Sequence, residues 1–262
     1  MHKIIRLALL LLILAAALPV VADVQSKAIE YQDGDTTLRG YLYWDDRYEK
    51  KRPGVLVLHE WWGLNAYARM RARILAEAGY VAFAPDLYGD GKMTEHAGEA
   101  KAWMQQISAN IEQWQQRAKL GLDQLKAQEQ VSGDELAAVG YCFGGATAMQ
   151  MAYAGMELKG VASFHGSLPA ATAEQQPNIK ASILALHGDA DQFVPQEKID
   201  AFKKSLNEAG ADWEMVVYGG ARHSFTVPDA ERKGIDNLKY DPKADRRSWA
   251  KLMSFLDELF RG

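Results

Sequence analysis

The sequence holds one cysteine, Cys142, and its surroundings are those of a nucleophile. It lies in the segment GYCFGG at 140–145, between an apolar run at 136–139 and a stretch rich in Ala and Met. The pattern G-x-C-x-G predicts a strand that turns sharply into a helix, with a strained residue at the tip. Glycines beside the tip leave room for the close backbone contacts of such a turn. We therefore interpret Cys142 as a nucleophile and not as a small buried apolar residue.

A thiol at neutral pH needs a base to become an efficient nucleophile. His223 closely follows an expected strand that ends at Tyr218, and Asp191 follows another expected strand. A sharp turn from a strand into a helix that carries the nucleophile at its tip is called a nucleophile elbow. The order cysteine, aspartate, histidine along the chain is the order in which enzymes with such an elbow place nucleophile, acid and base. Asp189 is the alternative acid, because Asp191 can also be read as a cap for the helix that starts near Pro195. The spacing favours Asp191.

The other histidines near strand ends do not form a metal-binding pattern. His59, His165 and His187 match no known ligand spacing, and two of them lie close to the ends of buried strands. The sequence therefore predicts no metal site.

Alternating strands and helices must position these residues. Two strands near 25–31 and 37–44, joined by a turn at Asp33-Gly34, predict an antiparallel edge hairpin. Six apolar runs predict further strands, at 55–58, 81–84, 136–139, 161–164, 183–186 and 215–218. This alternation predicts an α/β fold with a mostly parallel central sheet and helices on both faces. Cys142, Asp191 and His223 then lie at the carboxyl ends of strands, where such sheets bind ligands.

Besides the helix that follows Cys142, four helices are expected between and after these strands. Asn65 can cap the first, and Gly79 ends it. Apolar residues at helical spacing predict one long helix over about 103–125, whose residues Trp103 and Trp114 we interpret as core. A third helix starts near Pro195, and a closing helix carries Trp249 and several leucines on one face.

Residues 1–22 have the features of a signal peptide. Lys3 and Arg6 precede an apolar run at 7–18, which is too short for a spanning helix, and VVA at 20–22 predicts cleavage before Asp23. We expect an exported protein, periplasmic or secreted, without stable membrane insertion. Residues 23–262 then form a single domain.

Composition narrows the class of partner. The formal net charge of the 262-residue chain is −4, and residues 1–22 contribute only basic charges, so the exported part is more acidic still. Binding to nucleic acid is therefore excluded as a function. A single cysteine cannot form an intramolecular disulfide.

Five segments together resemble the dienelactone hydrolase family, over nearly all of residues 23–262: HEWWGLN at 59–65, PDLY at 85–88, GYCFGG at 140–145, HGDADQFVP at 187–195 and GARHSF at 220–225. The resemblance implies an α/β-hydrolase domain with a Cys-His-Asp triad and no cofactor. It also implies that Glu60 lies beside the thiol and helps to take its proton. The backbone N–H groups of Trp61 and Phe143 would form the oxyanion hole. Candidates to line an apolar pocket are Trp61, Trp62, Tyr88 and Phe143.

The sequence departs from that family in one respect. Dienelactone hydrolases hold a substrate carboxylate with arginines, whereas here Thr226 and Val227 follow HSF at 223–225, and GDGK follows Tyr88. Arg222 and Lys92 are the remaining candidates for that role.

The expected function is a monomeric hydrolase that cleaves a small-molecule carboxylic ester or lactone through a thioester on Cys142. A peptidase or acyltransferase on the same fold is an alternative, as is a non-catalytic binding protein. A redox-sensing thiol is less favoured, because no second cysteine can resolve a sulfenic acid.

Overall fold

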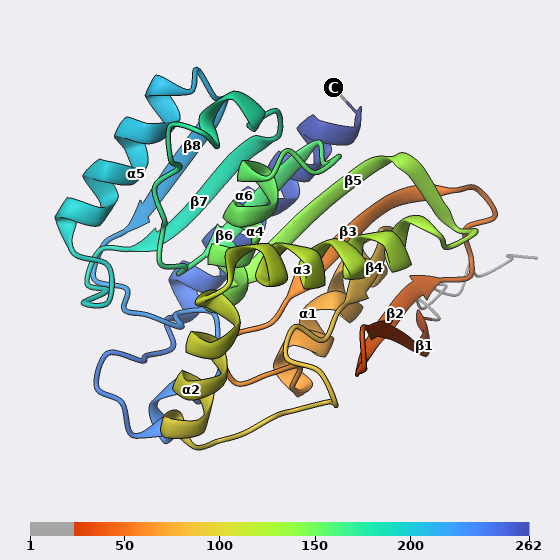
Figure 1. Cartoon of the computed structure of the whole chain (residues 1–262), viewed down its shortest axis with the longest axis horizontal. Coiled ribbons are helices and arrows are strands. Elements are labelled where there is room, and N and C mark those ends of the chain that lie inside the picture. The colour runs from red at the N-terminus through yellow and green to blue at the C-terminus, as the bar shows by residue number, and fades with distance from the viewer. Residues whose placement is uncertain (1–23, 262) are drawn as a thin grey trace, which may run out of the picture.

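The computed structural model describes residues 24–261, so the predicted signal peptide at 1–22 lies outside the described residues. One eight-stranded sheet runs through the chain in the order β1-β2-β4-β3-β5-β6-β7-β8 (Figure 1). Its strands are β1 (Val24–Asp33), β2 (Thr36–Asp45), β3 (Arg52–Leu58), β4 (Val81–Ala84), β5 (Val131–Tyr141), β6 (Gly160–Phe164), β7 (Ser182–Gly188) and β8 (Trp213–Tyr218). The long helices are α1 (Ala66–Glu77), α2 (Ala97–Ser108), α3 (Ile111–Lys126), α4 (Phe143–Tyr153), α5 (Gln196–Glu208) and α6 (Pro242–Arg261).

The predicted mostly parallel sheet with an antiparallel edge hairpin is confirmed. Strands β1 and β2 pair antiparallel from Val24 with Asp45 to Asp33 with Thr36, and β2 joins β4 antiparallel. All remaining neighbours, from β4 through β3 to β8, are parallel. The parallel strands therefore end at one common edge, where the loops after β3, β5, β7 and β8 converge.

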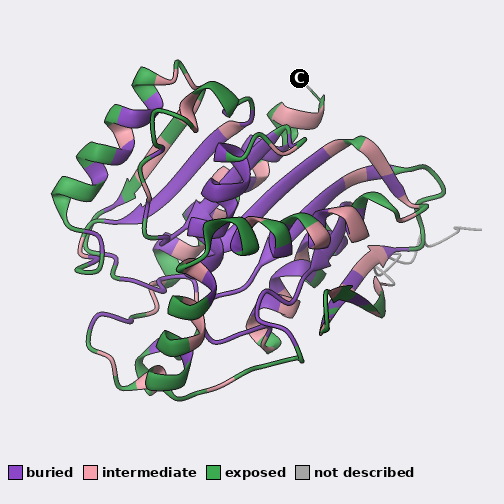
Figure 2. Ribbon diagram, in the orientation of Figure 1, coloured by how far each residue is buried: buried purple, intermediate pink, exposed green. Residues whose placement is uncertain are grey.

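Two apolar layers cover the sheet. Alternate residues of β3 face opposite sides: Leu56 and Leu58 belong to the apolar layer that also contains residues of α3, α4 and α5, whereas Val55 and Val57 belong to the layer that contains residues of α1 and α6. Figure 2 shows the central strands and α4 almost wholly buried, while the outer faces of α3 and α5 are exposed. Burial on both faces explains the continuous apolar runs of these strands.

One helix prediction was wrong. The helix expected over about 103–125 is two helices, α2 and α3, separated at Ala109 and Asn110. The backbone of Asn110 is extended, with φ −115° and ψ 98°, and its side chain accepts the N–H of Gln113. A side-chain cap of this kind starts a new helix and ends the old one. Asn65 caps α1 in the same way, as predicted.

Candidate active site

Cys142 occupies a strained turn between β5 and α4. Its φ is 53° and its ψ is −112°, a backbone conformation that is costly for a residue with a side chain. A Cβ on Gly140 would lie 1.9 Å from the Gly144 carbonyl oxygen, and one on Gly144 would lie 2.2 Å from the Leu58 carbonyl oxygen. The glycines of the GYCFGG segment are thus required by close backbone approach, and Cys142 itself is half-buried at the sheet edge.

The loops after β7 and β8 bring Asp191 and His223 into contact. His223 donates Nδ1–H to Asp191 Oδ2 at 2.7 Å. Asp191 Oδ1 accepts the N–H of Phe193 at 2.9 Å and the side-chain amide of Asn237 at 3.0 Å. Both partners are buried, which holds the imidazole in one orientation. Asp189, the alternative acid, is exposed, and within residues 24–261 its side chain has no hydrogen-bond partner.

The second ring nitrogen of His223 faces the thiol. Cys142 and His223 line the same cavity, and the sulfur lies close enough to influence the ionisation of the ring. Nε2 itself is buried, and within the described chain it has no partner in full hydrogen-bond geometry. Apo enzymes commonly show such loose alignment between nucleophile and base.

Electrostatics favour a protonated His223. Burial by itself lowers the pKa of His223, but the negative charge and hydrogen-bonding capacity of Cys142, together with the Asp191 carboxylate, raise it to about 10. Burial also tends to raise the pKa of Asp191, yet its hydrogen bond to His223 and the charge of the ring lower it below the ordinary range. His223 and Asp191 therefore each favour the charged form of the other.

Glu60, the second residue after β3, is buried and hydrogen-bonded to the loop after β8. Ser224 donates its hydroxyl to Glu60 Oε1 at 2.9 Å. His59 fixes the same loop: its Nδ1–H donates to the Glu60 carbonyl at 2.6 Å, and its Nε2 accepts the N–H of Leu87 at 3.2 Å. Burial raises the pKa of the Glu60 carboxyl, and the His223 charge and the Ser224 hydrogen bond oppose that rise.

Two backbone donors at this edge remain free. The N–H of Phe143 is the first of helix α4, and the N–H of Trp61 lies in the loop after β3. Neither has an acceptor within residues 24–261. The Trp61 carbonyl, in contrast, accepts the hydroxyl of Tyr88 at 3.0 Å, which holds this peptide in place. Free N–H groups at a helix start can stabilise a developing negative charge.

A cavity of about 550 Å³ opens onto Cys142 and His223. Trp61 and Phe143 line it, as predicted from the resemblance. Several of its walls come from residues that the sequence did not indicate: Lys101, Met104 and Ser108 of α2, Trp114 of α3, Ala146 of α4, and Ser167, Pro169, Phe193, Val194 and Leu238 of loops. Trp114 was predicted to be core; it is buried, but it also forms cavity wall and stacks on Phe143, with ring centroids 5.2 Å apart.

Three predicted pocket residues lie elsewhere. Trp62 is buried under the ammonium of Lys233, 4.7 Å from the ring centroid. Tyr88 lies behind Phe143, on which it stacks at 5.7 Å. The exposed Arg222 donates to the Asp236 carbonyl at 2.8 Å and does not reach the cavity.

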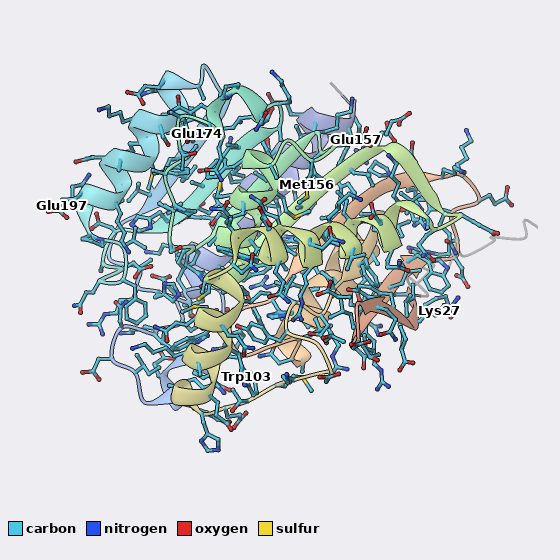
Figure 3. All side chains as sticks on the ribbon, viewed as in Figure 1. Lys27, Trp103, Met156, Glu157, Glu174 and Glu197 are labelled. Atoms are coloured by element: carbon cyan, nitrogen blue, oxygen red, sulfur yellow. The ribbon has the colours of Figure 1, made fainter. Side chains whose placement is uncertain are left out.

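Lys92, the other candidate for a substrate carboxylate, also lies outside this cavity. It lines a smaller cavity of about 220 Å³ together with Tyr88 and Trp103 of α2, the helix that carries the Trp103 label in Figure 3. Its ammonium lies 3.8 Å from Asp90. Tyr88 thus lines the smaller cavity and stacks on Phe143, which lines the larger one.

Two further observations concern the described residues as a whole. None of the helices in residues 24–261 combines the length and apolar character needed to cross a membrane. Over the same range, no three His, Cys, Asp or Glu side chains are grouped as a metal ion would need.

Comparison with known proteins places this geometry in a family. The model of the dienelactone hydrolase family matches residues 38–260. A solved structure named m3DLH has 39% sequence identity and a TM-score of 0.88, covering 90% of this chain and 99% of that one. A dienelactone hydrolase-like promiscuous phosphotriesterase from metagenomic libraries has 37% identity and the same TM-score and coverage. Protein usf of Aquifex pyrophilus is 28% identical over 237 residues, which cover 88% of this chain and 97% of that protein.

Proposed function

The chain belongs to the dienelactone hydrolase family, and on that premise we propose that it hydrolyses carboxylic esters or lactones through a thioester on Cys142. In this proposal His223 is the general base, Asp191 orients it, and Glu60 assists the removal of the thiol proton. The backbone N–H groups of Trp61 and Phe143 stabilise the oxyanion. The substrate is a small molecule, and no cofactor takes part.

One observation carries the proposal. A buried hydrogen bond of 2.7 Å joins Asp191 to His223, and the free nitrogen of that ring lies beside a thiol on a strained turn. Three loops that are far apart in the sequence thus supply the parts of a nucleophile, base and orienting acid.

The reaction proceeds in two halves. In the first, the Cys142 thiol proton passes to His223, directly or by way of Glu60, while the sulfur attacks the ester carbonyl carbon. The resulting tetrahedral oxyanion accepts the two backbone N–H groups, and each such donor contributes about 10²- to 10³-fold in rate. When the carbon–oxygen bond to the alcohol breaks, the imidazolium gives its proton to the departing oxygen, and a thioester remains.

In the second half, water replaces the alcohol. His223, neutral again, takes a proton from a water molecule that attacks the thioester carbonyl. Collapse of the second tetrahedral intermediate expels the Cys142 sulfur, which takes the proton from the imidazolium, and releases the carboxylic acid. For a lactone, the alcohol and acid are two ends of one product.

Hydrolysis of p-nitrophenyl acetate by purified residues 23–262 tests the proposal. We expect nitrophenolate release that falls to background in Cys142→Ala and in His223→Ala, whereas Cys142→Ser keeps a few per cent of the rate. Mass spectrometry of acid-quenched wild type should show an acetyl adduct on the Cys142 peptide. Equal rates for wild type and Cys142→Ala would refute the nucleophile and favour a binding protein.

A panel of substrates separates this function from its alternatives on the same fold. It should contain lactones, simple esters, peptides, and an amine acceptor for acyl transfer. A phosphotriester belongs in it as well, because one similar structure carries that activity in its name. We expect hydrolysis of esters or lactones to exceed peptide cleavage and acyl transfer; the opposite order would assign a peptidase or an acyltransferase.

We also propose that the protein is exported and acts as a monomer. The support for export is the composition of residues 1–22 described above. Expression of the full chain, followed by cell fractionation and N-terminal sequencing, should give an envelope or secreted protein that starts at Asp23. A cytoplasmic protein with its first residues intact would contradict export, and light scattering at the mass of a dimer would contradict the monomer.

A further inference from the structure

The cavity beside Cys142 is apolar over most of its wall. Four aromatic side chains line it, and Met104, Val194 and Leu238 add aliphatic surface; the four aromatics are Trp61, Trp114, Phe143 and Phe193. Its volume of about 550 Å³ is far larger than an acetyl group needs and lies within the range of sites for drug-sized ligands. A wall of this composition favours an apolar group on the substrate.

One part of the wall is held by ring stacking and hydrogen bonds. Trp114 and Phe143 stack with an interplanar angle of 11°, and Thr147 joins them. The Trp114 indole N–H donates to the Thr147 hydroxyl at 2.9 Å, and that hydroxyl donates to the Phe143 carbonyl at 2.9 Å. Because each ring is held, the wall presents a fixed flat surface beside the nucleophile.

Phe193 extends the apolar surface to the mouth of the cavity. Its side chain is 45% exposed, which is unusual for so large an apolar group, and its ring packs against the His223 ring at 5.0 Å. Its backbone N–H is held by Asp191. An exposed aromatic ring fixed at the rim of a cavity is suited to contact an apolar ligand that enters.

No buried lysine or arginine is among the residues that line the cavity. Lys101, the one lysine of the wall, is exposed on α2. Of the three arginines buried within residues 24–261, Arg52 begins β3 at the opposite edge of the sheet, and the other two already have partners. Arg71 donates to Asp245 and to the Thr226 carbonyl, and Arg117 donates to Asp33 and to the carbonyls of Leu87 and Tyr88.

Two carboxyl groups are already buried close to the His223 ring. The Glu60 carboxyl is buried and is influenced by the charge of His223, and Asp191 is hydrogen-bonded to the same ring. Positive charge on His223 is thus already paired with Asp191, and a substrate carboxylate stripped of water in this cavity would find no second buried cation in its wall. Burial of an unpaired charge is strongly unfavourable.

We infer that the enzyme acts on neutral esters or lactones that carry a bulky apolar acyl group, and not on substrates that bear a carboxylate on that group. The inference rests on the proposed hydrolase function for the reaction itself. The size and composition of the cavity supply the choice of substrate, and Trp114 and Phe193 are the residues that we expect to determine it.

Matched nitrophenyl esters test the inference. We compare p-nitrophenyl acetate, p-nitrophenyl hexanoate and mono-p-nitrophenyl adipate, whose acyl chain matches hexanoate but ends in a carboxylate. The quantity measured is kcat/KM from nitrophenolate release, after subtraction of the rate without enzyme. Each buried methylene is expected to raise kcat/KM about fourfold, so kcat/KM for the hexanoate ester should exceed that for the acetate ester at least about tenfold. Hexanoate should exceed adipate by about 30-fold or more.

A pair of variants in the cavity wall sharpens the test. Met104→Lys places an ammonium in the wall one turn along α2 from Lys101 and should reduce the preference for hexanoate over adipate at least about tenfold. Met104→Leu, of similar volume, should keep that preference. A wild-type enzyme that prefers adipate, and loses this preference in Lys101→Met, would overturn the inference and make Lys101 the anion site.

A binding measurement separates failure of this inference from failure of the proposed function. Cys142→Ala cannot form a thioester, and Trp61 and Trp114 lie in its cavity, so binding of each ester can be followed by quenching of tryptophan fluorescence. We expect the hexanoate ester to bind more tightly than the adipate ester by about the same factor as the ratio of their kcat/KM values. Tight binding of hexanoate without hydrolysis by wild type would refute only the hydrolase. Rapid hydrolysis with equal affinity for both esters would refute only the inference.

Discussion

Ser224, the residue after His223, donates its hydroxyl to Glu60 at 2.9 Å, and so connects the loop after β8 to the loop after β3. Ser224 has a left-handed backbone, with φ 56°, and its side chain is buried. Such a conformation costs free energy and persists only where surrounding contacts hold it. The hydrogen bond therefore connects the position of His223, the proposed base, with the ionisation of Glu60, the proposed accessory acid–base.

Ser224→Ala should alter the pH dependence of the reaction. It removes a hydrogen bond that lowers the pKa of Glu60, so that pKa should rise further above its ordinary range. We expect kcat/KM for p-nitrophenyl acetate to fall about tenfold at pH 7 and to recover in part at higher pH, where Glu60 ionises. The measurement is a full pH–rate profile. Glu60→Gln serves as the control, because its profile should lose this recovery; a Ser224→Ala profile parallel to that of wild type would contradict the link.

Asp191→Asn should reduce kcat by about 10³- to 10⁴-fold, because an amide cannot stabilise the imidazolium of His223 and favours the wrong tautomer. Asp189→Asn is the matched control, two residues away on the same loop and exposed. Its activity should equal that of wild type. Steady-state assays of both variants show which aspartate orients His223. An inactive Asp189→Asn beside an active Asp191→Asn would assign that role to Asp189.

Removal of the thiol should lower the pKa of His223. Burial lowers this pKa, whereas Cys142 and Asp191 raise it to about 10. In Cys142→Ala only Asp191 of these two remains to oppose the effect of burial, so the pKa of His223 should be lower than in wild type. NMR titration of the His223 ring in wild type and variant measures the change directly. An identical titration in both proteins would show that the sulfur does not act on the ring.

The same shift predicts a pH dependence of stability. The pKa of His223 in the folded protein lies above the unfolded value of 6.5. Its contribution to the free energy of unfolding is therefore complete below pH 6.5 and is lost as pH rises towards about 10. The free energy of unfolding of wild type should therefore fall over this range. Cys142→Ala should show a shallower fall, because its folded and unfolded pKa values differ less. Urea denaturation at pH 6.5, 8 and 10 provides the comparison, with the other titrating groups common to both proteins.

Gly144→Ala should damage the elbow. Its Cβ would lie 2.2 Å from the Leu58 carbonyl oxygen, so β3 and α4 must move apart. We expect a loss of about 3 kcal/mol in the free energy of unfolding, together with loss of esterase activity. Gly133→Ala in β5 is the control, since its Cβ would meet nothing within 4 Å, and its stability should change by less than about 0.5 kcal/mol. Equal stabilities in thermal unfolding would contradict the close approach.

Much of the scaffold was predictable because its signals are local. Continuous apolar runs identified the buried strands, Asn65 identified the start of α1, and the glycines of GYCFGG identified the turn after β5. These features follow from the backbone conformations and burial that each residue type favours. The break between α2 and α3 was missed, because the apolar spacing continues across it and only Asn110 marks the new start.

The sequence by itself determined the residue types that are able to do chemistry and the strand ends that carry them. It fell to the tertiary structure to decide which of them meet: Asp191 and not Asp189 reaches His223, and Asn237 supports the carboxylate from 46 residues away. The cavity wall was likewise a tertiary result. Trp114 and Phe193 line it while Arg222 turns to a loop carbonyl, because packing between loops and helices sets side-chain direction, and a linear pattern records only spacing along one element.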